Sequence, residues 1–526
     1  MINGKNIIGF EYSNEGSETF KAVNPALVTE IDGEFYSATE PEVARAVEKA
    51  VIAFDTYASL SGEKKANFLD QIGAEILDLG DELVQRAVQE SGLPETRIVG
   101  ERGRTVGQLN NFANLLREGS WVEASIDTAI PDRSPIPKPD LRKMLIPIGP
   151  VVVFGASNFP LAFSTAGGDT ASVLAGGNPV IVKAHNSHPG TSELVAEAIY
   201  KAAEKTGMPD GVFSHLQDKG YSVAQQLVTA EGVKAVAFTG SLRGGKALLE
   251  LSARRKVPIP VFAEMGSINP VIILPGALEN HGDLATQYAG SITLGSGQFC
   301  TNPGLLVSVA SDSLEKFKTQ LGNEIEKIVP TTMLNEGIYA HYQSLKENTI
   351  EQAGVKVLSK SSHNPGNTSG TPLVATVSGN DFISNPSLHE EVFGPFSLLV
   401  ECSDQDQLER VASLIEGQLT ITLMGTENDL INNKAVIKKL IHKTGRILFN
   451  GVPTGVEVCS SMQHGGPFPA SSDSRFTSVG TGAIKRFVRP MSYQNWPNDL
   501  LPLELQDKNP LGIWRLKDNN WNNSTE

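Results

Sequence analysis

The sequence is poor in cysteine and in long apolar runs. Its 526 residues include only three cysteines, Cys300, Cys402 and Cys459, at wide spacing and without a CxxC pair. This usage argues against a disulfide framework and against a thiolate metal site, so we expect no metal. No run approaches the roughly eighteen apolar residues that a membrane span needs, and the N-terminus lacks the pattern of a signal peptide. The sequence therefore predicts no membrane partner and a cytoplasmic protein.

Charge is not concentrated anywhere in the chain. Lysine and arginine number 44 and the acids 59, which gives a net charge of −15 without a basic stripe. Nucleic acid is therefore not an expected partner. The 50 glycines and 30 prolines beside 40% hydrophobic residues are typical of a compact α/β enzyme with many short loops. At this length, two or three packed units are expected.

Hydrophobic periodicity predicts the order of the elements. Amphipathic helices are expected over 40–60 and 63–92, and a third ends at Gly119. Prolines then break residues 124–143, which predicts edge strands or an extended arm suited to a subunit contact. From the apolar run 151–154 onward, strands alternate with helices, as in a doubly wound sheet. A second α/β unit is expected after Cys300, up to about residue 461.

Glu264 and Cys300 lie 36 residues apart, each beside glycine. A cysteine attacks as its thiolate, which needs a base within reach, and Glu264 is a candidate for that base. Asn158 follows the strand 151–154, where its amide could donate to a substrate oxygen that becomes negative. The alternatives are a cysteine that only fills the core and an asparagine that only makes a turn.

The sequence motifs around these residues resemble those of a known family. FAEMGSINP and GQFCTNPG contain Glu264 and Cys300, FTGS lies upstream, EEVFGP lies downstream, and Asn158 stands in GASNFP. In this order the motifs resemble the aldehyde dehydrogenase superfamily. The resemblance implies an α/β fold of two doubly wound domains, one cofactor-binding and one catalytic, with a small β arm for oligomerisation. We expect the cofactor-binding domain at 1–123 and 147–264, the catalytic domain at 265–461, and the arm and tail at 124–146 and 484–526.

The same resemblance assigns roles to single residues. Cys300 is the nucleophile, Asn158 and the N–H of Cys300 hold the oxyanion, and Glu264 activates the water that hydrolyses the thioester. Hydride passes to a nicotinamide, so the implied reaction is the NAD(P)⁺-dependent oxidation of an aldehyde to an acid. The expected cofactor contacts are Lys183 and Asn186 at the ribose, Gly240, Ser241 and Gly245 at the phosphates, and Glu391 and Phe393 at the nicotinamide. A homodimer or homotetramer is also implied.

Asn186 bears on the choice of nucleotide. In family members that prefer NAD, a glutamate often stands three residues after the lysine that corresponds to Lys183. An asparagine there removes the repulsion that a 2′-phosphate would meet. We therefore expect NADP as cofactor, with NAD as the alternative.

The C-terminal motifs bear on the substrate. PTGVEV, HGGPFPAS, TSVGT and RFVRPMSYQN resemble the α-ketoglutaric semialdehyde dehydrogenase branch of the superfamily, and NADP-dependent long-chain aldehyde dehydrogenases share parts of them. This predicts oxidation of 2,5-dioxopentanoate to 2-oxoglutarate, with a fatty aldehyde as the alternative. Arg104 and Gln108 are candidates to bind the substrate carboxylate, although a solvated helix face is the simpler interpretation. We interpret His464 as a turn or hydrogen-bonded histidine rather than an acid–base group.

Three other functions stay open at this stage. A cysteine hydrolase would use the thiol without a cofactor, but no local signature places a histidine beside Cys300. A CoA-acylating relative would tend to lack Glu264. A binding protein that keeps only the fold would have no need of Cys300, Glu264, Asn158 and Lys183 together.

Overall fold

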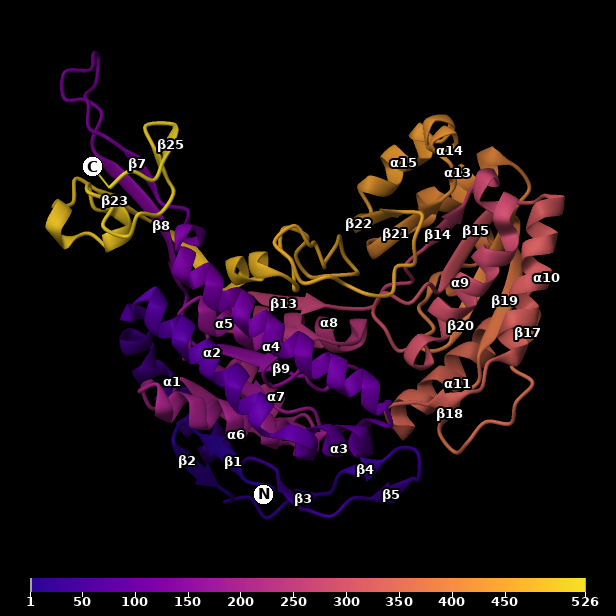
Figure 1. Ribbon diagram of the computed structural model, residues 1–526, viewed down its shortest axis with the longest axis horizontal. Coiled ribbons are helices and arrows are strands. Elements are labelled where there is room, and N and C mark those ends of the chain that lie inside the picture. Colours follow the sequence, from indigo (N-terminus) through magenta and orange to yellow (C-terminus); the bar gives the residue numbers. More distant parts are fainter. Residues whose placement is uncertain (1, 526) are drawn as a thin grey trace.

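A seven-stranded sheet organises the first half of the chain in the computed structural model, which describes residues 2–525 (Figure 1). Its order is β13 (Val261–Glu264), β12 (Ala235–Thr239), β9 (Val151–Phe154), β10 (Val180–Lys183), β11 (Phe213–Leu216), β1 (Asn6–Ile8) and β2 (Glu11–Ser13). The strands from β13 to β11 are parallel, and the hairpin of β1 and β2 adds an antiparallel edge. The predicted doubly wound sheet is confirmed.

Helices cover both faces of this sheet. Val151 and Val153 pack into one hydrophobic cluster and Val152 into another, because successive side chains of a strand point to opposite faces. The helices are α1 (Glu40–Ser59), α2 (Gly62–Asp78), α3 (Gly80–Ser91), α4 (Glu95–Glu118), α5 (Gly168–Ala175), α6 (Pro189–Lys205), α7 (Ser222–Thr229) and α8 (Leu242–Ala253). Helix α4 ends at Gly119, as predicted, because that glycine takes φ of 83° and caps the last turn.

The strand order reverses beside β9. Strands β10 and β11 lie on one side of β9, while β12 and β13 lie on the other. In open α/β sheets, ligands bind outside the carboxyl ends of the strands at such a switch point. The segments that follow β9 and β12 are those that carry Asn158 and Gly240.

A second seven-stranded sheet follows. Its order is β17 (Lys356–Lys360), β19 (Leu373–Ser378), β20 (Phe396–Cys402), β15 (Leu305–Val309), β14 (Val271–Ile273), β21 (Gln418–Met424) and β22 (Thr444–Phe449). Its helices are α9 (His281–Thr293), α10 (Asp312–Lys327), α11 (Glu336–Ile350), α12 (Gly379–Ser384), α13 (Gln405–Leu414), α14 (Glu427–Asn432) and α15 (Lys434–Ile441). The four strands expected from the sequence, β15, β17, β19 and β20, are all present.

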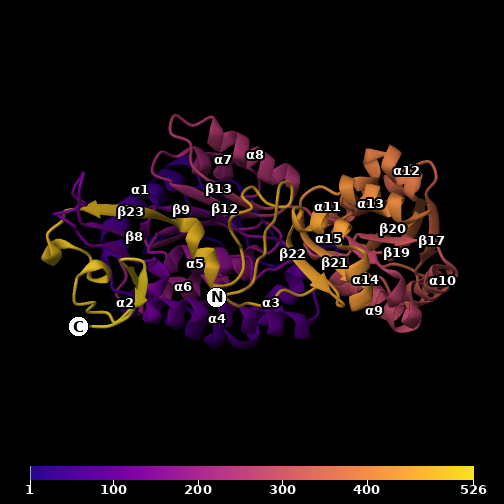
Figure 2. The ribbon, with the colours of Figure 1, turned by 90° about the horizontal axis from the view of Figure 1, so that it is seen from above.

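A five-stranded sheet projects from the half of the molecule that holds the first sheet (Figures 1 and 2). Strand β8 (Leu141–Pro147) pairs antiparallel with β23 (Val488–Gln494) along its whole length. This confirms that the proline-rich segment forms strands rather than a helix. The other members are β7 (Ser125–Asp127), β24 (Arg515–Lys517) and β25 (Asn520–Asn522). Three short pairs complete the strands: β3 (Thr19–Phe20) with β6 (Phe35–Tyr36), β4 (Val23–Asn24) with β5 (Thr29–Glu30), and β16 (Thr331–Thr332) with β18 (Ser369–Gly370).

The chain after β22 returns to the first sheet. This long segment runs between the two large sheets, as its late-sequence colour shows in Figure 2. It is tied to β13 because Met265 N donates to Ala470 O at 2.8 Å and Ala263 N donates to Ser472 Oγ at 2.9 Å. Residues 464–478 are thereby brought against the end of the strand that carries Glu264. Within residues 2–525, no helix has the length and apolarity needed to cross a membrane.

A buried ion pair fastens the end of this returning segment. Arg486 Nη2 lies 2.7 Å from Asp169 Oδ1 on α5, and both residues are less than a tenth exposed. R486M leaves a buried carboxylate without its partner, so we expect the free energy of unfolding to fall by about 3–5 kcal/mol. Urea denaturation followed by circular dichroism measures it.

The surface pair between Arg475 and Asp473 provides the control, because the Arg475 side chain is 78% exposed. R475M should change the free energy of unfolding by less than about 1 kcal/mol. If both substitutions lower the free energy of unfolding equally, the buried pair stabilises the fold no more than the surface pair does.

Candidate active site

Cys300 stands in a tight loop that leads into the second seven-stranded sheet. The loop follows the short 3₁₀ segment Leu294–Gly297 and leads into β15. Gly297 has φ of 65°, and a Cβ on it would lie 2.1 Å from Gly394 O, so only glycine fits there. The Asn269 amide donates to Cys300 O at 2.8 Å and to Asn302 O at 2.9 Å. These contacts fix the backbone that carries the thiol.

Glu264 ends β13, and both its carboxylate oxygens have partners. Oε1 lies 3.0 Å from His464 Nε2, and Oε2 accepts a hydrogen bond of 2.6 Å from Ser478 Oγ. Ser478 N in turn donates to His464 O at 2.8 Å. The returning segment therefore supplies both side chains that hold the carboxylate.

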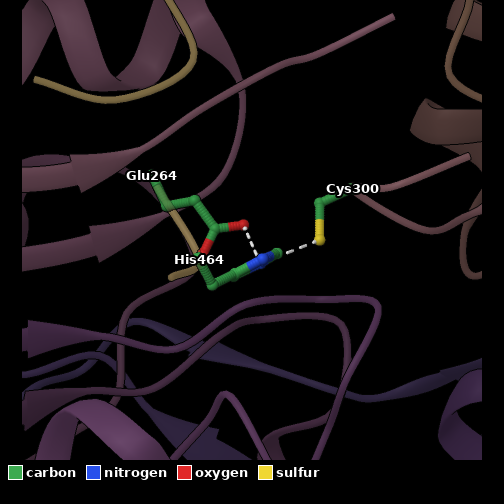
Figure 3. Close-up of side chains that lie close together, drawn as sticks. All are labelled: Glu264, Cys300 and His464. Atoms are coloured by element: carbon green, nitrogen blue, oxygen red, sulfur yellow. Dashed lines mark hydrogen bonds and ion pairs between the residues drawn. The ribbon is translucent and has the colours of Figure 1, made fainter. Parts of the chain in front are cut away.

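His464 joins the two predicted catalytic residues. Its Nε2 lies 3.4 Å from Cys300 Sγ as well as 3.0 Å from Glu264 Oε1 (Figure 3). The ligand atoms of the three side chains all lie within 4.8 Å of one another. The interpretation of His464 as a hydrogen-bonded histidine is correct but incomplete, because its ring nitrogen is placed to exchange a proton with the thiol.

The environment shifts the pKa values of Cys300 and Glu264 in opposite directions. Burial raises the pKa of the Cys300 thiol well above its ordinary value, and the negative charge of Glu264 raises it further. Burial would also raise the pKa of Glu264, but His464 and the hydrogen bond from Ser478 outweigh it and hold that pKa below its ordinary value. A thiol that resists ionisation next to an ionised carboxylate needs a nearby proton acceptor, and His464 Nε2 is such an acceptor.

Asn158 reaches the same loop from the cofactor-binding half. Its Nδ2 donates to Gln298 O at 3.1 Å, two residues before Cys300. Arg97 donates to Asn158 O at 2.9 Å and stacks over Phe159 and Phe299 at 4.7 and 4.5 Å from the ring centroids. One amide hydrogen is engaged by the loop, and Asn158 carries a second. Its role at the oxyanion stays a prediction.

The residues expected at the nucleotide line the carboxyl edge of the first sheet. Lys183 ends β10, and its Nζ donates to Asp218 O at 3.3 Å. Asn186 is exposed, and its Nδ2 donates to Lys219 O at 2.9 Å. Gly240 and Ser241 precede α8 and are exposed, while Gly245 lies within that helix against Met265. No contact tests their roles.

Glu391 and Phe393 lie on the segment before β20. Both are half-buried, and a Cβ on Gly266 would come within 2.3 Å of Glu391 Oε2. Burial raises the pKa of Glu391 to about 7. The structure thus brings Glu391 beside the segment that leaves β13, while its contact with a nicotinamide ribose stays a prediction.

Arg104 and Gln108 do not form a solvated helix face, and that interpretation is wrong. Gln108 is 1% exposed, and its Nε2 donates to Ala162 O at 3.3 Å. Arg104 is half-buried, and its Nη1 donates to Val456 O in the returning segment. Helix α4 packs against α2 and α5, and Arg104 and Gln108 lie on the side of it that faces the interior.

The sequence is similar to known proteins along nearly its whole length. The sequence matches the aldehyde dehydrogenase family over residues 12–476. The chain belongs to this family. It is 48% identical over 520 residues to α-ketoglutaric semialdehyde dehydrogenase 2 of Azospirillum brasilense, an alignment that covers 98% of this chain and 99% of that protein. It is 45% identical to α-ketoglutaric semialdehyde dehydrogenase of Acinetobacter baylyi, with 98% of each chain covered.

Solved aldehyde dehydrogenases share the fold at lower identity. The aldehyde dehydrogenase KauB of Pseudomonas aeruginosa has a TM-score of 0.80 at 22% identity, over 94% of this chain and 97% of that one. Betaine aldehyde dehydrogenase of Staphylococcus aureus, in complex with NAD⁺, has a TM-score of 0.80 at 19% identity, over 94% and 96%. The expected fold class is therefore confirmed.

The sequence did not predict the roles of two residues beside the site, His464 and Arg446. His464 is 164 positions from Cys300 in the chain, so no local signature connects them. Its place in the HGGPFPAS motif beside glycines was the one available signal. Arg446 on β22 stands in no motif that pointed to chemistry.

H464N should separate thiol ionisation from the rest of the reaction. Without the imidazole, Glu264 is the acceptor left near Sγ, and its negative charge raises the pKa of Cys300, so inactivation by iodoacetamide at pH 7 should slow by at least about 10-fold. The rates of variant and parent should converge as the pH rises toward that pKa.

H281N is the matched control, because the His281 ring on α9 only contacts Gln320, with Nδ1 and Oε1 2.6 Å apart. It should leave the alkylation rate within about twofold of the parent. Equal rates for H464N and the parent at neutral pH would mean that His464 does not accept the thiol proton.

Proposed function

We propose that this aldehyde dehydrogenase oxidises 2,5-dioxopentanoate to 2-oxoglutarate with NAD(P)⁺, NADP⁺ being preferred. The observation that carries the proposal is the contact of Cys300, His464 and Glu264 in a chain that is 48% identical to an α-ketoglutaric semialdehyde dehydrogenase over nearly its full length. The three cysteines are free thiols, which suits a reducing compartment such as the cytoplasm.

The residues at the carboxyl edge fit a dinucleotide. The α8 N-terminus is capped by Ser241 and exposes backbone N–H groups, and a Lys183 Nζ with only one carbonyl acceptor has hydrogens left for ribose hydroxyls. Glu391 would accept from the nicotinamide ribose. A bound NAD(P)⁺ supplies the hydride acceptor of the reaction.

The chain's own residues perform the addition. The neutral His464 ring carries its proton on Nδ1, so Nε2 can take the Cys300 proton, and the Glu264 carboxylate 3.0 Å away stabilises the imidazolium that results. The sulfur then adds to the aldehyde carbon, and the oxygen takes the negative charge. The free amide hydrogen of Asn158 and the N–H of Cys300 are the donors for that oxygen. Loss of hydride leaves a thioester on Cys300.

Glu264 then acts as the general base that hydrolyses the thioester. Its carboxylate stays ionised because its pKa is held below the ordinary value, so it can take a proton from water. Water attacks the thioester carbon, the acid leaves, and the thiolate is restored. The retained glutamate supports hydrolysis over acyl transfer to CoA.

Steady-state kinetics tests the proposal. We expect kcat/KM for 2,5-dioxopentanoate to exceed that for decanal by at least about 10-fold with either nucleotide. A clear preference for decanal would make the protein a fatty aldehyde dehydrogenase. Because the contact of Cys300 and His464 would also suit a cofactor-free hydrolase, ester cleavage without nucleotide that outpaces aldehyde oxidation would overturn the proposal.

E264Q should trap the acyl-enzyme. Without a base for water, one equivalent of reduced nucleotide should form rapidly, and turnover should then slow by at least about 100-fold. Stopped-flow absorbance and intact-protein mass spectrometry measure both effects. The exposed Glu390 provides the control E390Q. Loss of the burst in E264Q would instead place Glu264 before the hydride step.

N186E tests the nucleotide preference. A carboxylate at this exposed position should repel a 2′-phosphate, so the ratio of kcat/KM for NADP⁺ to that for NAD⁺ should fall by at least about 10-fold. N186Q keeps the amide and should keep the ratio. An unchanged ratio in N186E would show that Asn186 does not face the adenosine ribose.

The β arm supports a homodimer or homotetramer. Large apolar side chains are exposed along the arm and tail: Ile136 at 68%, Trp496 at 48%, Leu500 at 70% and Trp521 at 65%. Apolar groups gathered on one projecting element mark a contact surface. We propose that copies of this chain associate through the five-stranded sheet.

A further inference from the structure

Two arginines from different halves of the molecule donate hydrogen bonds to one short segment beside the active site. Arg104 on α4 donates Nη1 to Val456 O. Arg446 on β22 donates Nη2 to Pro453 O at 3.0 Å and to Gly455 O at 3.4 Å. The segment 453–456 is thus flanked by a guanidinium on each side, one from the cofactor-binding half and one from the catalytic half.

Neither guanidinium forms a close ion pair, although the charge of Glu101 acts on Arg104 from further away. Across residues 2–525, no carboxylate lies within 4 Å of a nitrogen of Arg104 or Arg446, and the Nε of each is buried without an acceptor. Arg486 is paired with Asp169 and Arg142 with Asp140, whereas the buried Arg515, like Arg104 and Arg446, donates to backbone carbonyls. A buried charge is costly unless it is paired, so a ligand carboxylate would stabilise the two guanidiniums beside the thiol.

Both arginines lie next to the catalytic group. Arg104 stands over the Phe163 ring at 5.8 Å, and that ring lies 6.4 Å from the His464 ring. Arg446 Nη1 lies 3.8 Å from Met462 Sδ, two residues before His464. Burial lowers the pKa of both guanidiniums. Negative charge acts in the opposite direction, from Glu101 and then Cys300 on Arg104, and from Cys300 on Arg446. The two cations therefore share an environment with the sulfur.

We propose that Arg104 and Arg446 bind the carboxylate of the aldehyde substrate and thereby select short oxo acids over uncharged aldehydes. This inference rests on the proposed function and deepens it by naming the specificity residues. The planar guanidinium matches a carboxylate, and its remaining N–H groups can also donate to the 2-oxo oxygen. The same charges penalise an alkyl chain, which offers them no acceptor.

Two other roles for the pair make different predictions. If the arginines only hold the segment 453–456, their loss affects every substrate alike. If they only lower the pKa of the thiol, their loss slows alkylation of Cys300. A specificity role instead changes the ratio between charged and uncharged substrates.

The test compares R446M and R104M with the parent on 2,5-dioxopentanoate, 5-oxopentanoate and pentanal. Pentanal matches 5-oxopentanoate in length and lacks the carboxylate. The ratio of kcat/KM for each oxo acid to that for pentanal should fall by about 10- to 100-fold in either variant, mostly through KM. The alkylation rate of Cys300 and the melting temperature are measured alongside.

R102M is the matched control on the same helix, because Arg102 donates to Gly80 O at 2.8 Å, whereas Arg104 donates to Val456 O beside the site. It should leave the ratio at the parent's value. An equal fall for pentanal and the oxo acids, or no fall in the ratio, would overturn the specificity role.

The outcome also separates this inference from the proposed substrate. If the parent prefers 5-oxopentanoate to pentanal but does not oxidise 2,5-dioxopentanoate, the proposed substrate is wrong and the role of the arginines stands. If the parent oxidises 2,5-dioxopentanoate and the variants keep the ratio, the substrate stands and the role of the arginines is wrong.

Discussion

The active site depends on one nitrogen shared between two acids. His464 Nε2 contacts both Cys300 Sγ and Glu264 Oε1, at 3.4 and 3.0 Å. Burial and the charge of Glu264 together disfavour the thiolate, so the imidazole is the group that can relieve that penalty. The proton needed for catalysis therefore moves within one buried cluster whose members come from three separate stretches of chain.

Keeping those stretches together requires close backbone approach. Gly297 lies against Gly394 O, and Gly480 lies against Cys459 O, each with 2.1 Å to the position that a Cβ would occupy. Side chains at these positions would push the thiol loop away from β20 or the returning segment away from the site. Glycine-rich sequence around the site is thus a steric requirement, which explains why composition alone already indicated short, tight loops.

Helices and strands were largely readable from the sequence because their signals are local. The amphipathic helices α1, α2 and α4, the buried run of β9 and the proline-broken arm each follow from periodicity or from backbone chemistry within a few residues. The polar face of α4 was misread, because periodicity shows which side chains differ but not what covers them. Arg104 and Gln108 are covered by segments far away in the chain.

The sequence by itself determined the family, the thiol, the carboxylate and the order of the elements, since each depends on residue identity or on near neighbours. Only the tertiary structure shows that His464 lies within proton-transfer distance of the thiol. It likewise shows that Arg446 and Arg104 both contact the segment 453–456 near the thiol. These residues are separated by 164 and 342 positions from their partners. Such contacts are set by how β13, β22 and the returning segment pack, and no local pattern encodes that packing.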